Sequence, residues 1–326
     1  QNSFRALTGL CALGLIVACG NRQPTEPDEG RTGDPDRPRV ALIMKAISNP
    51  FFGTMAEGAK AEAAERNVDL TVLSVPRETD FEKQAAHVED MTAQGVAAII
   101  LAPADSKAIV SPLLEAQKRG IHIINIDNRI DPETAESAGL KVLTFIGPDN
   151  AAGAEKSTNY LIEQIGGKGK VAMLEGIRGV DNAEQRKRGF QRAVEATNGA
   201  VEVVAMETAE WAQDLAQQKM AGILTRHPDL DGVFCANDNM ALGAIAAVES
   251  AGLSEQVHVT GYDNLEAAQD AIRDGAMDAT IEQHPDRMGA MGVEYALKAI
   301  NGESFPEEIE VPTDLITAET LKENNE

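Results

Sequence analysis

Aromatic residues and positive charge are both scarce in this chain of 326 residues. Aromatic side chains make up only 4% of it, so the core has to be built from Ala, Val, Ile and Leu. Lys and Arg total 29 against 52 Asp and Glu, which leaves a net charge of −23. Because binding to phosphates needs an excess of basic side chains, this balance argues strongly against a nucleic acid partner. The charge is otherwise typical of a solvated acidic surface and identifies no ligand.

The sequence also lacks the motifs of common enzymes. Its five histidines show none of the spacings of a metal site. They are His87, His122, His227, His258 and His284. A Gly-x-Ser-x-Gly motif and a phosphate-binding loop are missing as well. We therefore expect a protein that is not an enzyme, with no catalytic residue, no metal and no cofactor.

Only three cysteines are present, and each lies in a different setting. Cys11 belongs to an apolar stretch near the N-terminus, and Cys235 lies in the strand-like run 233–236, where we expect a small buried side chain. Cys19 is predicted to carry a lipid, so no pair of cysteines is left and we expect no intramolecular disulfide in the mature chain.

The N-terminal segment has the pattern of an export signal. An apolar run, Ala6–Ala18, follows Arg5 and is too short to span a bilayer as a helix. It ends in Ile16-Val17-Ala18-Cys19-Gly20, which resembles the lipobox of bacterial lipoproteins. Residues 1–18 would then be a signal peptide and Cys19 the acylated first residue; the alternative is an ordinary signal peptide cut nearby.

The segment that follows has almost no apolar residues. Residues 21–39 are mostly Pro, Gly, Asp, Glu and Arg, a composition that cannot bury a core. We predict a flexible tether over residues 19–38. The folded part would lie outside the cytoplasm, in the periplasm or at the cell surface, and only the lipid on Cys19 would attach it to a membrane.

After Arg39, β-rich apolar runs alternate with helical stretches every 25–30 residues or so, which is the period of βα units. The predicted strands are Val40–Met44, Asp69–Ser74, Ala97–Leu101, His122–Ile126, Val142–Ile146, Lys170–Leu174, Val201–Met206, Gly232–Ala236, Val257–Gly261 and Asp278–Glu282. Helices are predicted at Phe52–Arg66, Phe81–Gln94, Ala151–Ile165 and Gln213–Arg226. About ten such units favour an α/β fold of two doubly wound parallel-sheet domains. The natural break is Gly147-Pro148, with Asn150 as the cap of the next helix.

Polar and aromatic residues follow the ends of many of these strands. They are Asn49-Pro50-Phe51-Phe52, Asp127-Asn128-Arg129, Trp211, Asn237-Asp238, Asp263 and Gln283. Open α/β sheets place their ligand crevice at strand ends. Carboxylates, amides and an arginine suit hydroxyl groups, and flat aromatic rings suit apolar ring faces. This combination favours a sugar or polyol as ligand.

In these motifs the chain resembles the type I periplasmic sugar-binding proteins, in particular the ribose-binding branch, from Arg39 to the C-terminal region. The resemblance rests on Asn49-Pro50-Phe51-Phe52, the run 237–244, Gly261-Tyr262-Asp263 and Ala279-Thr280-Ile281-Glu282-Gln283 in this order. It implies two lobes joined by a hinge of three crossings, near Pro148, Gln283-His284 and Pro312-Thr313. The N-terminal lobe would be residues 39–148 plus 284–312, and the C-terminal lobe 149–283 plus 313–326. Sequence reading without the resemblance gives a single crossing.

The resemblance also implies roles for individual residues. Asn49 would contact a sugar hydroxyl, although a turn residue before Pro50 explains it equally by type. Phe51 and Phe52 would pack on the sugar, and two adjacent Phe residues cannot both face the same core. Asp127 would accept two hydroxyl hydrogen bonds, with a turn or cap aspartate as the alternative.

Four more positions match ligand-contacting positions of the resembled family. Trp211 would stack on the sugar, unless this lone Trp merely covers a helix start. Asn237, Asp263 and Gln283 match unchanged. Asp238 is expected instead to cap a helix over Asn239–Ala251.

Two departures from the ribose pattern leave the identity of the ligand open. Asn128 comes between Asp127 and Arg129, so Asn128 is a candidate for the contact that the arginine would make. Glu184 stands where the ribose type has a ligand arginine, and the retained Arg186 either contacts the ligand or fixes the helix start. Pentoses, hexoses, inositol and other polyols all stay open.

The function implied is that of a monomeric extracytoplasmic solute-binding protein, which closes on a sugar or polyol and delivers it to the permease of an ABC transporter. The alternative is a sensory protein that presents a sugar-like signal to a membrane receptor. A repressor of the same fold would need a basic helix-turn-helix before Arg39, where the chain has a lipobox and an acidic tether. A glycosidase pair, Asp127 and Asp263, would have to come from opposite lobes.

Overall fold

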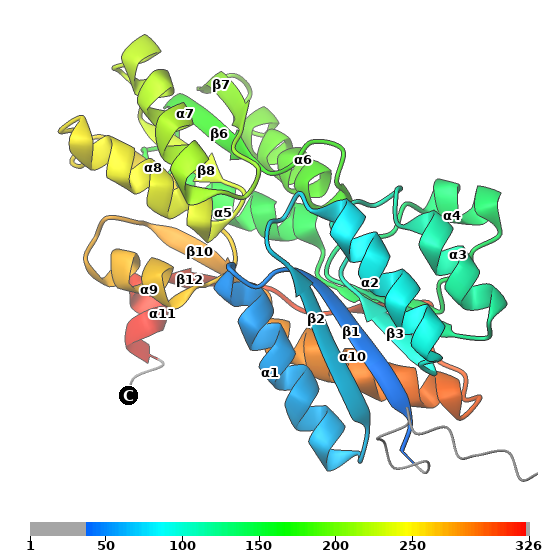
Figure 1. Cartoon of the computed structure of the whole chain (residues 1–326). Coiled ribbons are helices and arrows are strands. Elements are labelled where there is room, and N and C mark those ends of the chain that lie inside the picture. Colours follow the sequence, from blue (N-terminus) through cyan, green and yellow to red (C-terminus); the bar gives the residue numbers. More distant parts are fainter. Residues whose placement is uncertain (1–36, 324–326) are drawn as a thin grey trace, which may run out of the picture. The chain divides into compact units, whose positions relative to one another are not determined.

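The computed structural model describes residues 37–323, and within these residues the strands form two six-stranded sheets (Figure 1). The first has the order β11-β5-β4-β3-β1-β2 and the second β12-β10-β9-β8-β6-β7. The first sheet consists of β1 (Arg39–Ala46), β2 (Asp69–Val75), β3 (Ala98–Leu101), β4 (His122–Ile126), β5 (Thr144–Gly147) and β11 (Glu308–Glu310). The second consists of β6 (Gly169–Glu175), β7 (Val201–Thr208), β8 (Gly232–Cys235), β9 (His258–Thr260), β10 (Ala279–Glu282) and β12 (Asp314–Thr317).

Helices alternate with the strands along the chain. Over residues 37–323 they are α1 (Pro50–Glu65), α2 (Phe81–Gln94), α3 (Val110–Lys118), α4 (Pro132–Ala138), α5 (Asn150–Gln164), α6 (Asp181–Glu195), α7 (Gln213–Arg226), α8 (Asp238–Ser250), α9 (Glu266–Arg273), α10 (Pro285–Ile300) and α11 (Ala318–Glu323). In the part of the chain that the structure describes, none of them is long and apolar enough to cross a membrane. The predicted signal peptide and Cys19 lie outside the described residues.

The prediction of two parallel-sheet α/β lobes is confirmed. The ten predicted strands form within two residues of the expected bounds, and the Phe81–Gln94 and Gln213–Arg226 helices begin and end where expected. Strands such as β3 and β8 are buried at every residue because helices cover both faces of a parallel sheet. Cys235 is fully buried in β8, as expected of a small core residue.

The chain passes between the sheets three times, so the single crossing read from strand order alone is wrong. It leaves the first sheet after β5, returns to it with α10 and β11, and ends on the second sheet with β12. The sequence analysis missed β11 and β12 because both are short, and Glu308-Ile309-Glu310 has a single apolar residue. β12 pairs with β10 in the antiparallel sense, at the edge of an otherwise parallel sheet.

Two helix caps differ from the sequence prediction by one residue. The side chain of Asp149, not Asn150, caps α5 by accepting a hydrogen bond from the Ala152 N–H at 2.9 Å. Asn237, not Asp238, caps α8. In each case the cap is the residue with extended backbone just before the first turn, as a cap requires.

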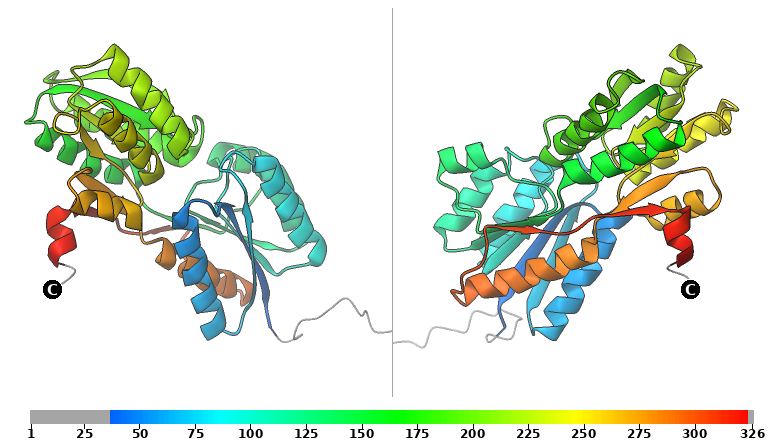
Figure 2. Two further views of the ribbon diagram at one scale, coloured as in Figure 1. Left: turned by 60° about the vertical axis from the view of Figure 1, so that its left-hand side comes forward. Right: turned by 180° about the vertical axis from the view of Figure 1, so that it is seen from behind.

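Helices α1 and α10 lie side by side against the first sheet, although more than 200 residues separate them in sequence (Figures 1 and 2). Glycines allow this close approach. A Cβ atom on Gly58 would lie 2.1 Å from the Asp286 carbonyl oxygen, and one on Gly289 would lie 2.0 Å from the Met55 carbonyl oxygen. The late helix α10 is thereby fixed to the first sheet.

Gly58→Ala should therefore destabilise the protein by about 1–3 kcal/mol. The new methyl group would clash with the Asp286 backbone, and the two helices would have to move apart to relieve the clash. The measurement is the free energy of unfolding from denaturant titration. Gly53→Ala in the same helix is the matched control, since a Cβ there meets nothing within 4 Å. It should leave stability unchanged or raise it by up to about 1 kcal/mol. Equal effects of the two variants would contradict this account of the contact.

Candidate functional site

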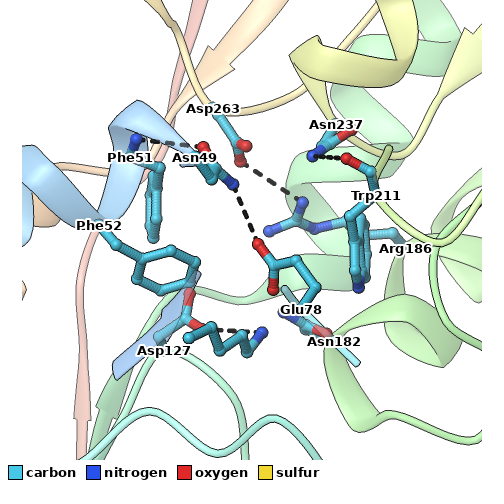
Figure 3. A pocket seen from close by; sticks show the side chains of 11 residues that line it. Asn49, Phe51, Phe52, Glu78, Asp127, Asn182, Arg186, Trp211, Asn237 and Asp263 are labelled. Carbon is cyan, nitrogen blue, oxygen red and sulfur yellow. Dashed lines mark hydrogen bonds and ion pairs between the residues drawn. The ribbon is translucent and has the colours of Figure 1, made fainter. Parts of the chain in front are cut away.

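Residues from the carboxyl ends of strands in both sheets line one cavity of about 250 Å³ (Figure 3). They follow β1, β2 and β4 of the first sheet and β7, β8 and β9 of the second, and α6 adds two more. The lining residues are Lys45, Asn49, Phe51, Phe52, Glu78, Asp127, Asn182, Arg186, Trp211, Asn237 and Asp263. Eight of the twelve predicted ligand residues, the retained Arg186 among them, are thus brought together.

A buried ion pair forms the wall of the cavity on the first sheet. The Lys45 Nζ lies 3.3 Å from the Asp127 Oδ2, and both side chains are less than 5% exposed. The same ammonium lies 5.7 Å from the centre of the Phe52 ring. Asp127 has a left-handed backbone with φ of 63°, and such strained residues gather at functional sites. Together these contacts fix the carboxylate at the end of β4.

Arg186 forms the corresponding wall on the second sheet. Its guanidinium donates hydrogen bonds to the Asn150 Oδ1, the Ala236 carbonyl and the Gln283 Oε1, at 2.8, 2.7 and 3.1 Å. It also lies 3.5 Å from the Asp263 Oδ1. Burial raises the pKa of Asp263 well above its usual range, and the Arg186 charge acts in the opposite direction. This arginine therefore holds its partners in place as well as facing the cavity.

Glu78 projects into the cavity between these two walls (Figure 3). Its Oε1 accepts a hydrogen bond from the Asn49 Nδ2 at 3.4 Å, while the Asn49 Oδ1 caps α1 through the Phe51 N–H. Burial raises the pKa of Glu78, with the Lys45 charge opposing it. Three carboxylates line the cavity. Asp127 and Asp263 each have an ion-pair partner within residues 37–323, whereas Glu78 has none among these residues.

Aromatic rings enter the cavity from both sheets. Phe51 and Phe52 meet edge to face, with ring centres 5.1 Å apart. Trp211 enters from the opposite side, and it and Glu210 are two consecutive left-handed residues shortly after the end of β7. Its indole rests on Gly176, where a Cβ would lie 2.1 Å from the ring. A ligand with apolar C–H faces and polar edges would be held between these rings.

Four predicted ligand residues lie outside the cavity lining. Gln283 lies behind it, where its Nε2 donates to the Asp263 Oδ1 at 2.6 Å. The Asn128 side chain is fully buried, where it donates to the Pro103 carbonyl and accepts from the Asn182 N–H. Arg129 pairs with Glu308 near the surface and covers the Phe145 ring. Glu184 accepts from the Gly179 N–H at 2.9 Å and completes the turn before α6. Their side chains make these contacts within the fold, and their predicted contact with a ligand stays a prediction.

Sequence reading missed three residues of the lining, namely Lys45, Glu78 and Asn182. After Arg39, Lys45 is the one charged residue in the apolar strand Arg39–Ala46. A charge in such a strand indicates a buried partner or a site, so this residue could have been predicted. Glu78 lies three residues beyond the end of β2, in a polar loop where an acidic residue is unremarkable. The Oδ1 of Asn182 is buried and has no hydrogen-bond partner among residues 37–323.

The buried ion pair should dominate stability at this site. Lys45→Met leaves the Asp127 carboxylate buried without a cation, so we expect a loss of roughly 3–5 kcal/mol in the free energy of unfolding. Adding Asp127→Asn should recover much of that loss, because no buried charge remains. Lys60→Met is the control: its pair with Glu57 is exposed and should cost less than about 1 kcal/mol. Denaturant titrations of the four proteins would contradict this picture if the double variant were the least stable.

The chain is similar to sugar-binding proteins over nearly its whole length. It is 37% identical to the D-ribose/D-allose-binding protein of Pseudomonas aeruginosa, over 95% of this chain and 97% of that one. It is 34% identical to the ribose import binding protein of Escherichia coli, over 85% and 88%. Its structure resembles an ABC transporter periplasmic solute-binding protein from Actinobacillus succinogenes with bound D-allose, with a TM-score of 0.84 and 41% identity, covering 88% of this chain and all of that one.

A more distant structural neighbour is the Caulobacter myo-inositol-binding protein with bound myo-inositol, which has a TM-score of 0.80 and 28% identity and covers 87% of this chain and 95% of that one. Residues 40–304 match the family described as the periplasmic binding protein domain. That match spans most of the chain and includes every residue that lines the cavity, but it ends before β11 and β12, the last strand of each sheet. This chain therefore belongs to the periplasmic binding protein family.

Proposed function

We propose that this protein binds a monosaccharide between its two lobes and delivers it to the permease of an ABC transporter. The observation that carries the proposal is the cavity itself. Three carboxylates and three amides face hydroxyl groups there, and rings from both sheets face apolar C–H surfaces. The relatives support the same conclusion, since sugars are bound in the neighbouring structures and named in the similar proteins.

D-Allose and D-ribose are the sugars to test first. The Pseudomonas relative is named for both, and the Actinobacillus structure holds D-allose. Two lining residues, Glu78 and Lys45, favour the hexose. Glu78 and Lys45 add an acceptor and a donor to the cavity beyond those matched by the ribose motifs, and additional hydroxyl groups require additional partners.

We propose that the ligand enters through a larger cavity and is then enclosed by hinge closure. That cavity, of about 1300 Å³, shares Asn49, Glu78 and Trp211 with the smaller one. The lobes would be residues 39–148 with 284–312, and 149–283 with 313–326, a division that the membership of the two sheets supports. The three short links between the sheets would act as the hinge. Closure would remove the sugar from water and signal occupancy to the permease.

We further propose that the protein acts outside the cytoplasm, attached to a membrane by lipid on Cys19 alone. The family supports an extracytoplasmic location. The apolar run Ala6–Ala18, the small residue before Cys19 and the tether over residues 19–38 support the anchor. We expect a monomer, because one chain supplies both walls of the cavity.

Titration with sugars tests the binding function. Trp211 is the only tryptophan in the chain and lines the cavity, so its fluorescence should change saturably with D-allose or D-ribose. Glu78→Gln should weaken binding about tenfold or more without harming the fold, because it removes a charged acceptor from the cavity. Glu82→Gln, on the exposed first turn of α2, is the matched control and should leave affinity unchanged.

The outcomes separate the function from the role of one residue. Silence across pentoses, hexoses and polyols, in both fluorescence and thermal shift, would refute the proposed function. Normal affinity in Glu78→Gln would remove only Glu78 from the set of contacts.

Metabolic labelling with an alkyne fatty acid in a bacterial host tests the anchor. The full chain should take up label and sediment with membranes, and Cys19→Ala should lose both properties. Cys235→Ala is the control, since that buried thiol should make no difference. Persistent labelling of the Cys19→Ala protein would show that the lipid is attached elsewhere.

A further inference from the structure

Helix α6 begins without a cap from its own lobe. Its N-cap residue is Val180, which makes no side-chain capping bond within the described chain. The first N–H groups of a helix have no partner inside it, and a buried start needs partners from elsewhere. The Asn182 N–H donates to the Asn128 Oδ1 at 3.1 Å, and the Asp181 N–H donates to the Ser106 Oγ at 3.3 Å. Both partners come from loops of the other lobe.

The two capping side chains are held rigidly within the first lobe. Ser106 follows β3 and Asn128 follows β4. The Asn128 Nδ2 donates to the Pro103 carbonyl at 2.9 Å and to the Ser106 Oγ at 3.3 Å. Because both amide hydrogens are directed into its own lobe, the Asn128 carbonyl oxygen has to face α6. Both residues are 3% exposed or less, so water does not compete for these bonds.

The helix that receives the caps belongs to the second lobe. It packs against α5 and contacts β6 and β7. Separation of the lobes would therefore break both bonds and leave the first N–H groups of α6 uncapped. The helix also carries Asn182 and Arg186 into the cavity. The hydrogen bond to the Asn182 N–H thus fixes a residue whose unpaired Oδ1 faces the place where ligand would lie.

We propose that Asn128 and Ser106 form a latch between the lobes, which caps α6 only in the closed form and so stabilises closure without touching the ligand. Asn128 is then a positioning residue. This inference rests on the proposed function, because the latch would slow ligand release. It also gives a role to Asn128, one of the departures from the ribose pattern.

Stopped-flow measurement of Trp211 fluorescence, with whichever of D-allose and D-ribose binds, tests the latch. Asn128→Ala and Ser106→Ala should each raise the dissociation rate constant about tenfold, as expected for the loss of one or two buried hydrogen bonds. The association rate constant should change by less than about twofold, because the open form is unaffected. An unchanged dissociation rate in both variants would overturn the proposal.

Asp131→Ala is the matched control. Asp131 caps α4 by accepting from the Thr134 N–H at 2.9 Å, a bond of the same type that stays within one lobe. This variant should lower the midpoint of thermal unfolding but leave the dissociation rate within about twofold of the wild type. An equal rise in dissociation rate in Asp131→Ala would mean that general destabilisation, and not a latch, explains the result.

Small-angle X-ray scattering without sugar keeps the latch separate from the proposed function. Asn128→Ala should have a larger radius of gyration than the wild type, because its closed form loses a stabilising contact. Equal radii would count against the latch. If the wild type binds no sugar at all, the proposed function fails and the comparison of radii alone decides on the latch.

Discussion

The buried guanidinium of Arg186 is the interaction on which the second half of the site depends. It joins the start of α5, the end of β8, the second link between the sheets and the carboxylate of Asp263. Its Cζ atom lies 3.7 Å from the centre of the Tyr262 ring, so the buried charge also packs on an aromatic face. The planar donor fork of arginine satisfies several acceptors at once, which a lysine could not do. One side chain thus sets the positions of residues from four separate elements.

The charges of the site are balanced within each lobe. Lys45 and Asp127 both belong to the first lobe, and Arg186 and Asp263 both belong to the second lobe. Breaking a buried ion pair costs several kcal/mol, roughly 3–5 in measured cases. Because neither pair crosses between the lobes, the lobes can separate without leaving a buried charge alone. The bonds that do cross, at the start of α6, involve neutral side chains and cost far less to break.

The parts of this structure that follow local rules could be predicted from the sequence. Apolar, β-rich runs located ten of the twelve strands of residues 37–323, and residues at the ends of several of them identified the cavity. Long-range partners could not be read in the same way. Arg129 and Gln283 are donors of a type that suits a sugar. In the structure Arg129 pairs with Glu308 and Gln283 donates to Asp263, and both partners are distant in sequence. Lys45 was missed as a lining residue because strand patterning alone does not expect a charge inside an apolar strand. Its partner Asp127, which is distant in sequence, compensates that charge.

The caps and edge strands show the same limit at a smaller scale. Asp149 and Asn150 are both good capping residues, and only the backbone at Asp149 selects between them. β11 and β12 are too short to predict from sequence, β11 also has a single apolar residue, and each forms at the edge of an existing sheet.

The placement of α10 and β11 has a consequence for the order in which the protein can fold. Five strands of the first sheet lie within residues 39–147, yet its sixth strand and the helix that packs on α1 come after residue 284. A ribosome therefore makes nearly the whole chain before the first sheet is complete. Contacts so distant in sequence slow folding, because the ends of a long loop must meet before any of them form. The first sheet thus stays incomplete until residues 308–310 are made, and a polypeptide that has not completed its fold can still be threaded across a membrane.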